Sequence, residues 1–352
     1  MAEMTYDTAK PVLVTGATGF VAGWLVKQLL ELGYTVHAAV RSPDDEAKRS
    51  HLDALAGQTP GAIRYFKADL NEPGSFDAAA EGCSVIFHTA SPFTSKISDP
   101  QTDLVDPAVN GTRTVLEAAN KAQSVERVVL TSSCAAIYGD NQDVADAPGA
   151  CLTEAVWNTT SSLDHQAYSY SKTQAERAAW DMAKAQDRWR LVVVNPSFIL
   201  GPSLNEKPTS ESFAIVRQLA DGSMKTGAPP YEIGAVDVRD VADAHVRAAF
   251  IPEAEGRHIT SAVNTSLLGL AERLRDQVGE GPFPTRELPK FMVWLVGPMM
   301  NKMLTRKMIS RNMGHAFCAD NTKSKRALGM EYRDIAPGLG EMHAQLKAAG
   351  KV

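Results

Sequence analysis

Short apolar runs rich in β-branched residues alternate with longer helix-like stretches along the first two hundred residues of this chain. The runs cover 11–16, 34–40, 62–70, 84–90, 127–133 and 190–195. Helix-like segments such as 21–32 and 103–122 separate them, which gives consecutive strands the long crossover that parallel pairing needs. Strands this uniformly apolar are typical of a sheet that helices cover on both faces. The pattern therefore predicts an α/β fold built on a doubly wound parallel sheet.

Composition and charge limit the kinds of molecule that this chain is expected to bind. The 352 residues are 44% apolar and 22% charged, which is near the average for globular proteins, and the net charge is -5. An acidic balance offers no general attraction to nucleic acid or to an anionic membrane, so we expect neither as a partner. The longest apolar run, 291–300, is interrupted by Gly297 and Pro298 and is shorter than the ~20 residues of a membrane span. The N-terminus lacks a signal peptide pattern, and we expect a cytoplasmic protein that takes a small-molecule substrate.

The four cysteines are far apart in the sequence, and no two form a C-x-x-C pair. No Cys/His group has the spacing of metal ligands either. We therefore expect reduced, partly buried thiols and no metal site. The cysteines are Cys83, Cys134, Cys151 and Cys318.

A glycine-rich turn follows the first expected strand, with the spacing T-G-x-x-G-x-x-A over residues 15–22. Gly16 permits a tight turn, Gly19 lets the backbone approach a pyrophosphate, and Ala22 allows close packing of helix on sheet. The free N–H groups and the dipole of the helix that starts here favour an anion. A turn without a ligand is the alternative. We predict dinucleotide contacts from Gly16, Thr18, Gly19, Phe20 and Val21.

The residues after the second and third strands select the dinucleotide. An NAD site would normally place an acidic residue after the second strand, but this chain has Arg41, whose guanidinium suits a 2′-phosphate. Lys48 adds a second cation, although both residues would also fit an ordinary solvated surface. The two cations and the missing acid favour NADP(H). Asp69 and Leu70 are placed to meet the adenine, and capping of the following turn is the competing role for Asp69.

Tyr168 and Lys172 form a Y-x-x-x-K pair on a helix expected over 165–185, so they lie one turn apart on the same face. An unperturbed phenol has a pKa of about 10 and is a poor acid near neutral pH. A neighbouring ammonium stabilises the phenolate and lowers that pKa. Lys172 also has the reach to hold the nicotinamide ribose. Tyr170 points to the other side of the helix, and His165 is expected to be a solvated residue at the helix start.

Ser132 and Ser133 end the fifth expected strand, at the sheet edge where doubly wound folds bind ligands. Successive strand residues point in opposite directions, so one of the two serines is expected to face the site. Its hydroxyl would hold a substrate carbonyl oxygen and stabilise the developing alkoxide. Local hydrogen bonding at the strand end is the alternative.

With these residues the chain resembles the extended short-chain dehydrogenase/reductases, in particular the group of dihydroflavonol reductases, cinnamoyl-CoA reductases and microbial ketone or aldehyde reductases. The resemblance implies a Rossmann domain, Ser133 as the catalytic serine, and Arg41 with Lys48 as 2′-phosphate ligands. It also implies that Pro196 and Ser197 shape the nicotinamide pocket and that Ala90 lies along the cofactor. It rests on TGATGFVA, VRSPDDEAK, FHTASP, DPAVNGTRTVLEAA, RVVLTSSCAAIY, YSYSK, NPSFILGP, VDVRDVADAH and NTKSKRALGMEYRD.

Two departures from the group's patterns bear on the substrate. Tyr138 stands where dihydroflavonol reductases carry an asparagine for substrate hydroxyls, which argues against a flavonoid. The cinnamoyl-CoA reductase pattern N-W-Y-C-Y-x-K reads QAYSYSK here, which argues against a CoA ester. A carbonyl reductase of broad scope remains. Phe93, Tyr138 and Phe198 flank the cofactor motifs and are the expected substrate neighbours.

The second half of the chain is expected to interleave with the first. A strand-like stretch at 232–238 and a helix-like one at 240–250 resume the earlier rhythm after turn-rich segments. We therefore predict a cofactor domain from 1–196 and 232–262, and a smaller, mostly helical substrate lobe from 197–231 and 263–352. Six of the twelve methionines fall within 292–313. That segment suits a flexible pocket, plain core or a subunit contact, and the sequence leaves these open.

These observations predict an NADPH-dependent ketone or aldehyde reductase, monomeric or homodimeric, in which Tyr168 donates the proton. A nucleotide-sugar epimerase or dehydratase shares the core and the Y-x-x-x-K pair, but Arg41 argues against one. A non-catalytic NADP-binding sensor is the third class, and the retained Ser133, Tyr168 and Lys172 argue against it.

Overall fold

The computed structural model describes residues 3–91, 97–205, 210–300 and 304–352. Seven parallel strands form its large sheet, in the spatial order β3-β2-β1-β4-β5-β6-β9. This confirms the doubly wound sheet, and each of the six expected runs contributes one strand. The strand order reverses between β1 and β4, and ligands of such sheets bind beside that reversal at the carboxyl ends. The strands are β1 Val12–Thr15, β2 Thr35–Val40, β3 Ala62–Lys67, β4 Val85–His88, β5 Arg127–Thr131, β6 Arg190–Pro196 and β9 Gly256–Thr260.

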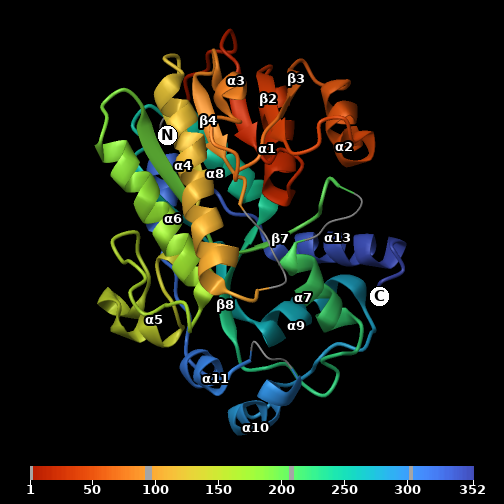
Figure 1. Cartoon of the computed structure of the whole chain (residues 1–352). Helices are drawn as coiled ribbons and strands as arrows, with labels where there is room; N and C mark the ends of the chain where they lie inside the picture. The colour runs from red at the N-terminus through yellow and green to blue at the C-terminus, as the bar shows by residue number, and fades with distance from the viewer. Residues whose placement is uncertain (1–2, 92–96, 206–209, 301–303) are drawn as a thin grey trace.

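The two faces of the large sheet are covered by separate helical layers. Val12 and Val14 of β1 belong to a buried cluster with α1 and α8, whereas Leu13 packs on the opposite face with α3, α4 and α6. This alternation follows from the two-residue period of a strand. Figure 1 shows α4 and α6 side by side on their face. The helices are α1 Phe20–Glu31, α3 Asp77–Ala80, α4 Asp106–Lys121, α6 Ala167–Lys184 and α8 Val238–Phe250.

A second sheet of three strands lies below the large one, in the order β10-β8-β7 (Figure 1). Strands β7 and β8 are parallel, and β8 and β10 are antiparallel. Three helices, α7, α9 and α13, enclose a core of their own against this sheet. The lobe that the sequence describes as mostly helical therefore also contains a small mixed sheet. Its elements are β7 Phe198–Leu200, α7 Glu211–Ala220, β8 Glu232–Asp237, β10 Val263–Ser266, α9 Leu267–Val278 and α13 Ile335–Ala348.

The strand expected at 232–238 forms as β8 but does not return to the large sheet. The chain rejoins that sheet at β9, whose residues 256–260 pair with 192–196 of β6. An apolar run indicates a strand without indicating its neighbour, which explains the error. The helix expected at 240–250 does form as α8 and covers the large sheet. The division into 1–196 with 232–262 and 197–231 with 263–352 stays a prediction.

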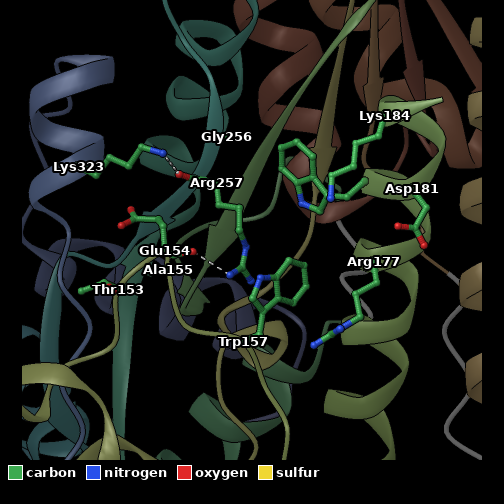
Figure 2. Close-up of a pocket in the computed structure, with 11 residues that line it drawn as sticks. Thr153, Glu154, Ala155, Trp157, Arg177, Asp181, Lys184, Gly256, Arg257 and Lys323 are labelled. Carbon is green, nitrogen blue, oxygen red and sulfur yellow. Dashed lines mark hydrogen bonds between the residues drawn. The ribbon is translucent and has the colours of Figure 1, made fainter. Parts of the chain in front are cut away.

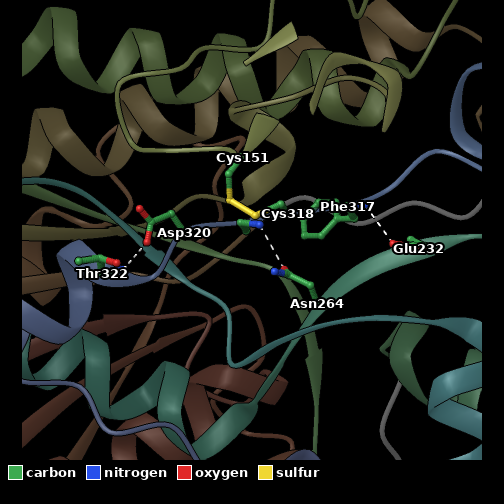
Figure 3. The surroundings of a disulfide bond; sticks show 8 residues. Cys151, Glu232, Asn264, Phe317, Cys318, Asp320 and Thr322 are labelled. Carbon is green, nitrogen blue, oxygen red and sulfur yellow. Dashed lines mark hydrogen bonds between the residues drawn. A yellow bond between two sulfur atoms is a disulfide. The ribbon is translucent and has the colours of Figure 1, made fainter. Parts of the chain in front are cut away.

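Cys151 and Cys318 form a disulfide across a sequence separation of 167 residues, and Figure 3 shows its surroundings. The prediction of four reduced thiols is therefore wrong for this pair, while Cys83 and Cys134 are free and buried. Neighbouring backbone holds the two segments together, because the Leu152 N–H donates to the Cys318 carbonyl at 2.9 Å. Spacing along the chain cannot reveal such a tertiary pairing.

The remaining helices are short. Helices α10 and α11 lie together at the end of the molecule that is farthest from β2 and β3 (Figure 1). Within the described ranges, no helix has both the length and the apolar character needed to cross a membrane. The bounds are α2 Glu46–Ala56, α5 Gln142–Asp146, α10 Lys290–Met300, α11 Arg306–Asn312 and α12 Thr322–Leu328.

Candidate active site

The glycine-rich turn joins β1 to α1 as the sequence predicts. Gly16 has a φ of +63°, a conformation that side chains disfavour, and an added Cβ would lie 3.1 Å from Ala90. The Gly19 N–H donates to the Gly16 carbonyl at 2.8 Å and closes the turn. Gly19 is the N-cap residue of α1, and it makes no side-chain hydrogen bond to the first N–H groups of the helix. Thr18, Phe20 and Val21 lie in this turn or in the first turn of α1.

The carboxyl ends of β1 and β4 are fastened together beside this turn. The Thr15 hydroxyl lies 3.1 Å from His88 Nδ1 and accepts from the Ala90 N–H at 3.0 Å. Burial, with a smaller contribution from the nearby Lys172 charge, lowers the pKa of His88 to about 3, so this imidazole is neutral at physiological pH. These bonds place Ala90 against Gly16, and its contact with a cofactor stays a prediction.

The two cations expected at a 2′-phosphate lie at the end of β2 and the start of α2. Arg41 is exposed and makes no ion pair within the described ranges. Lys48 lies in the first turn of α2, with its Nζ 2.8 Å from the Asp45 carboxylate. The bond from Lys48 is the main cause that lowers the pKa of Asp45. Water and salt weaken such an exposed pair, so Lys48 remains able to turn toward a phosphate.

The end of β3 shows the alternative role of Asp69. Its Oδ1 accepts from the Asn71 N–H at 2.9 Å and from Asn71 Nδ2 at 3.1 Å. Asp69 therefore caps the following turn, and its contact with an adenine stays a prediction. Leu70 packs against Gly111 of α4, where an added Cβ would come within 2.9 Å of its side chain.

The three residues expected to be catalytic meet at the end of β5 and the start of α6. Ser133 follows β5, and its side chain lies close enough to Tyr168 to act on the pKa of that phenol. Lys172 lies one turn after Tyr168 on α6, and its Nζ donates to the Ser91 hydroxyl at 3.1 Å. Ser91 was not predicted from the sequence, although it directly follows Ala90. The arrangement places a hydroxyl, a phenol and an ammonium beside the glycine turn.

The ionisation of this group is set mainly by burial. Desolvation raises the pKa of Tyr168 above its ordinary value, and the Ser133 side chain offsets only part of this, although the tyrosine as a whole is 52% exposed. The expectation that the neighbouring Lys172 ammonium lowers this pKa is therefore not met. Desolvation also lowers the pKa of Lys172 to about 8, while the Glu176 carboxylate works to raise it. Lys172 can therefore hold or release a proton near neutral pH, which suits a proton relay.

Glu176 lies one further turn along the same face of α6 and was not singled out from the sequence. Its buried carboxylate accepts from the Ser132 hydroxyl at 2.5 Å, from Asn195 Nδ2 at 2.9 Å and from Arg257 Nε at 2.6 Å. Asn195 also donates to the Ser133 carbonyl at 3.1 Å. The repeat 168, 172, 176 is the signal that could have found it. This network supports the strand end that carries Ser133.

Two of the three expected substrate neighbours, Tyr138 and Phe198, lie within the described residues, and they belong to different clusters. Tyr138 contacts the Phe317 ring at 5.3 Å between centroids, and burial raises its pKa well above the ordinary value. Phe198 lies in β7 and packs against the core of the small sheet. Phe93 lies outside the described residues. Phe317, which the sequence did not suggest, is therefore a further apolar neighbour of Tyr138.

His165 is buried, so the expectation of a solvated residue is wrong. Its Nε2 lies 2.7 Å from the Asp140 carboxylate, which also accepts from Arg311 at 2.5 Å and Asn312 at 2.6 Å. Burial works to raise the pKa of Asp140, but these bonds outweigh it and leave the pKa below its ordinary value. Asp140 thus joins the start of α6 to α11, a long-range contact that the sequence cannot show.

A cavity of about 760 Å³ opens elsewhere, between α6 and β9 (Figure 2). Trp157 stands in it between two guanidinium groups, with Arg257 at 4.0 Å and Arg177 at 4.8 Å from its ring centroid. None of the residues predicted for the site lines this cavity. Arg257 forms part of its wall and is the ion-pair partner of Glu176, so the cavity borders the back of the network.

The residues present fit a bound dinucleotide. Gly16 leaves a space that a Cβ would fill, and the N-terminus of α1, which has no side-chain cap from Gly19, presents N–H groups that suit a pyrophosphate. The Ser197 hydroxyl, next to Pro196 at the end of β6, is buried without a hydrogen-bond partner among the described residues. These features lie at the same edge of the sheet as Lys172. Within the described part of the chain, no group of three or more His, Cys, Asp or Glu side chains could hold a metal ion.

Comparison with known proteins gives matches over most of the chain. The model of the NAD dependent epimerase/dehydratase family matches residues 12–260. A putative anthocyanidin reductase of Ginkgo biloba is 38% identical over 297 residues, 81% of this chain and 86% of that protein. Cinnamoyl-CoA reductase 1 of Arabidopsis thaliana is 41% identical over 290 residues, 80% of each chain. The crystal structure of the yeast methylglyoxal/isovaleraldehyde reductase Gre2 with NADPH is 28% identical with a TM-score of 0.77, covering 97% of this chain and 100% of that one.

Proposed function

We propose that this chain is an NADPH-dependent ketone or aldehyde reductase. The chain belongs to the NAD dependent epimerase/dehydratase family and, within it, to the extended short-chain reductases of the dihydroflavonol and cinnamoyl-CoA reductase kind. One observation carries the proposal: Ser133, Tyr168 and Lys172 meet beside the glycine turn. Reduction of a carbonyl requires a group that holds the carbonyl oxygen, a proton donor and a charge that stabilises the donor after it loses its proton. The hydroxyl, the phenol and the ammonium can fill these three roles.

The proposed mechanism assigns one task to each residue. NADPH, when bound, supplies the hydride that adds to the carbonyl carbon. The Ser133 hydroxyl donates to the carbonyl oxygen, and Tyr168 transfers its phenolic proton to the same oxygen, which gives the alcohol. The Lys172 ammonium stabilises the phenolate that remains and orients the ribose. Ser91 accepts a hydrogen bond from Lys172 and fixes its direction.

We assign the choice of NADPH over NADH to Arg41, with Lys48 in support. A guanidinium at the end of β2 matches the geometry of a 2′-phosphate, and Arg41 has no carboxylate partner to give up within the described ranges. An acidic side chain, which would hold the free 2′-hydroxyl of NAD, is absent at that position. Gly16, Gly19, Ala90 and Ser197 would hold the rest of the cofactor.

The substrate lobe is proposed to comprise 197–231 and 263–352, with the cofactor domain made of 1–196 and 232–262. Tyr138 and Phe317 form an apolar wall next to the strand end that carries Ser133. Such a wall suits a small apolar or aromatic carbonyl compound rather than a charged nucleotide sugar. We therefore assign ketones and aldehydes as the substrate class.

The decisive experiment follows NADPH and NADH consumption over a panel of aromatic aldehydes, diketones, ketoesters, hydroxycinnamoyl-CoA esters and dihydroflavonols. We expect turnover with NADPH on uncharged carbonyls. The variant Tyr168→Phe should lower kcat by roughly 10²- to 10⁴-fold, the usual contribution of a general acid, while NADPH binding is retained. Near-full turnover by a folded, NADPH-binding Tyr168→Phe variant would refute the mechanism.

A further inference from the structure

Helix α10 is apolar on nearly every side and yet stands largely in solvent. Phe291 is 71% exposed, Leu295 59% and Met299 87%, and among the residues of α10 only Val293 and Gly297 are buried. Elsewhere in the described ranges, the large apolar side chains that are exposed are Tyr6, Ile97 and Tyr168. The exposed set on α10 is Phe291, Met292, Trp294, Leu295, Val296, Met299 and Met300.

This exposure is unusual for a helix of this composition. A helix that is apolar all round is normally buried in a protein core or in lipid, and contiguous apolar surface marks a contact site. The packing of α10 on the protein is confined to one side, where Val293 meets Ile309 and Met313. Figure 1 shows α10 at the end of the molecule beyond α11, so its other sides face outward.

The charge around α10 is opposite to that of the whole protein. Residues 286–311 contain six lysines and arginines and one acidic residue, although the chain carries a net charge of -5. Arg311 is neutralised by Asp140 and Asp143, so the excess positive charge comes from the other cations of this segment. Arg306 and Lys307 are exposed, and the Arg306 guanidinium lies 4.6 Å from the centre of the Trp294 ring. In a two-fold contact between copies this patch would meet itself and oppose like charges. An anionic partner suits it better.

We propose that α10 docks this protein on the surface of an anionic lipid bilayer. Phe291, Leu295 and Met299 would enter the interfacial region, while Arg306 and Lys307 meet lipid phosphates. Eleven residues make a helix of about 16 Å, too short to span the hydrocarbon core and suited to lie in its surface. The net charge of the chain predicts no such attraction, but its local distribution does. The proposal is independent of the reductase activity.

Co-sedimentation with vesicles of phosphatidylcholine, with and without phosphatidylglycerol, tests the proposal. We expect stronger binding to the anionic vesicles and a loss of at least tenfold in the triple variant Phe291→Ser/Leu295→Ser/Met299→Ser. Lys307→Ser should weaken binding about fivefold, the typical effect of one cation at such a surface. Ile97→Ser is the matched control, an exposed aliphatic residue outside α10 whose change should leave binding as it is.

Unchanged thermal unfolding and NADPH binding of the variants would show that they fold, as exposed positions allow. If the protein binds neither the neutral nor the anionic vesicles, the proposal is overturned. Equal binding to neutral and anionic vesicles overturns the electrostatic part. If the wild type instead associates with itself, as followed by sedimentation velocity, and the triple variant is monomeric, a second copy covers α10 and the proposal is wrong.

Discussion

The substitution Glu176→Gln tests whether the buried network behind the site supports catalysis. Glu176 is 1% exposed and Arg257 is 6% exposed, with Arg257 Nε 2.6 Å from the carboxylate. A glutamine keeps the shape of the side chain but leaves the Arg257 cation without a counter-charge. Breaking one partner of a buried ion pair typically costs 3–5 kcal/mol. Because Arg257 also donates to the carbonyls of Glu154 and Val156, we expect about 3 kcal/mol, the lower end.

The same substitution should change the ionisation of Lys172. The Glu176 charge raises the pKa of Lys172, which desolvation has lowered to about 8, so its removal should lower that pKa further. Less Lys172 is then protonated at neutral pH, and the alkaline limb of kcat should move to lower pH. Urea unfolding measures the first effect, and the pH profile of kcat with saturating NADPH measures the second.

A double variant separates the two effects. In Glu176→Gln/Arg257→Met the uncompensated cation is gone, so part of the lost stability should return. The Lys172 pKa should stay low because the carboxylate is still missing. Two results of Glu176→Gln together would contradict this reasoning: a free energy of unfolding within about 0.5 kcal/mol of the wild type, and an unchanged pH profile of kcat. Glu176 would then neither stabilise the protein nor raise the pKa of Lys172.

Three further substitutions address the cofactor site and the disulfide. Arg41→Ala should raise the KM for NADPH roughly 10- to 100-fold, the value of a charged phosphate bond, and leave the KM for NADH nearly unchanged; equal effects on both would refute 2′-phosphate recognition. Gly16→Ala should lower the free energy of unfolding by about 1–2 kcal/mol, because φ is +63° and Ala90 is close, and should weaken NADPH binding in a fluorescence titration. Unaltered NADPH affinity would remove Gly16 from the site. Cys151→Ser should cost about 2–5 kcal/mol in unfolding under non-reducing conditions. Reduction of the wild type should then lower its Tm, whereas reduction of the variant should not.

Local patterns were enough to predict most of the large sheet. Six of its seven strands appear as apolar runs, and five of these are largely buried, where few other compositions are available; β3 is the exception, a partly exposed edge strand. The glycine turn and the Tyr168–Lys172 pair were also found because both are short-range patterns, in which a few residues at fixed spacing set the geometry. Their meeting with Ser133 followed from the rule that ligands bind at the carboxyl ends of parallel strands.

Features that depend on distant contacts could not be predicted. Three such features are the place of β8 in a second sheet, the Cys151–Cys318 bond and the burial of His165 beside Asp140. Each depends on contacts between segments that are separated in the sequence, or on which of several strands becomes the neighbour. Glu176 is intermediate, because its helical spacing was visible but its partners Asn195 and Arg257 come from two other strands. A carboxylate on a helix face gains a function only when the fold supplies its donors.

Helix α10 shows most clearly why averages fail to reveal a surface. Its composition is that of a core helix, and the sequence alone does not decide among core, contact surface and pocket, although it favours the first two over a pocket. The fold decides among them, because one side of α10 packs on α11 and the others have nothing over them in the described ranges. Net charge misleads in the same way, since an acidic chain can carry a basic apolar end. Partner predictions therefore need the distribution of charge and apolar surface in three dimensions, and α10 is where this protein departs furthest from its average.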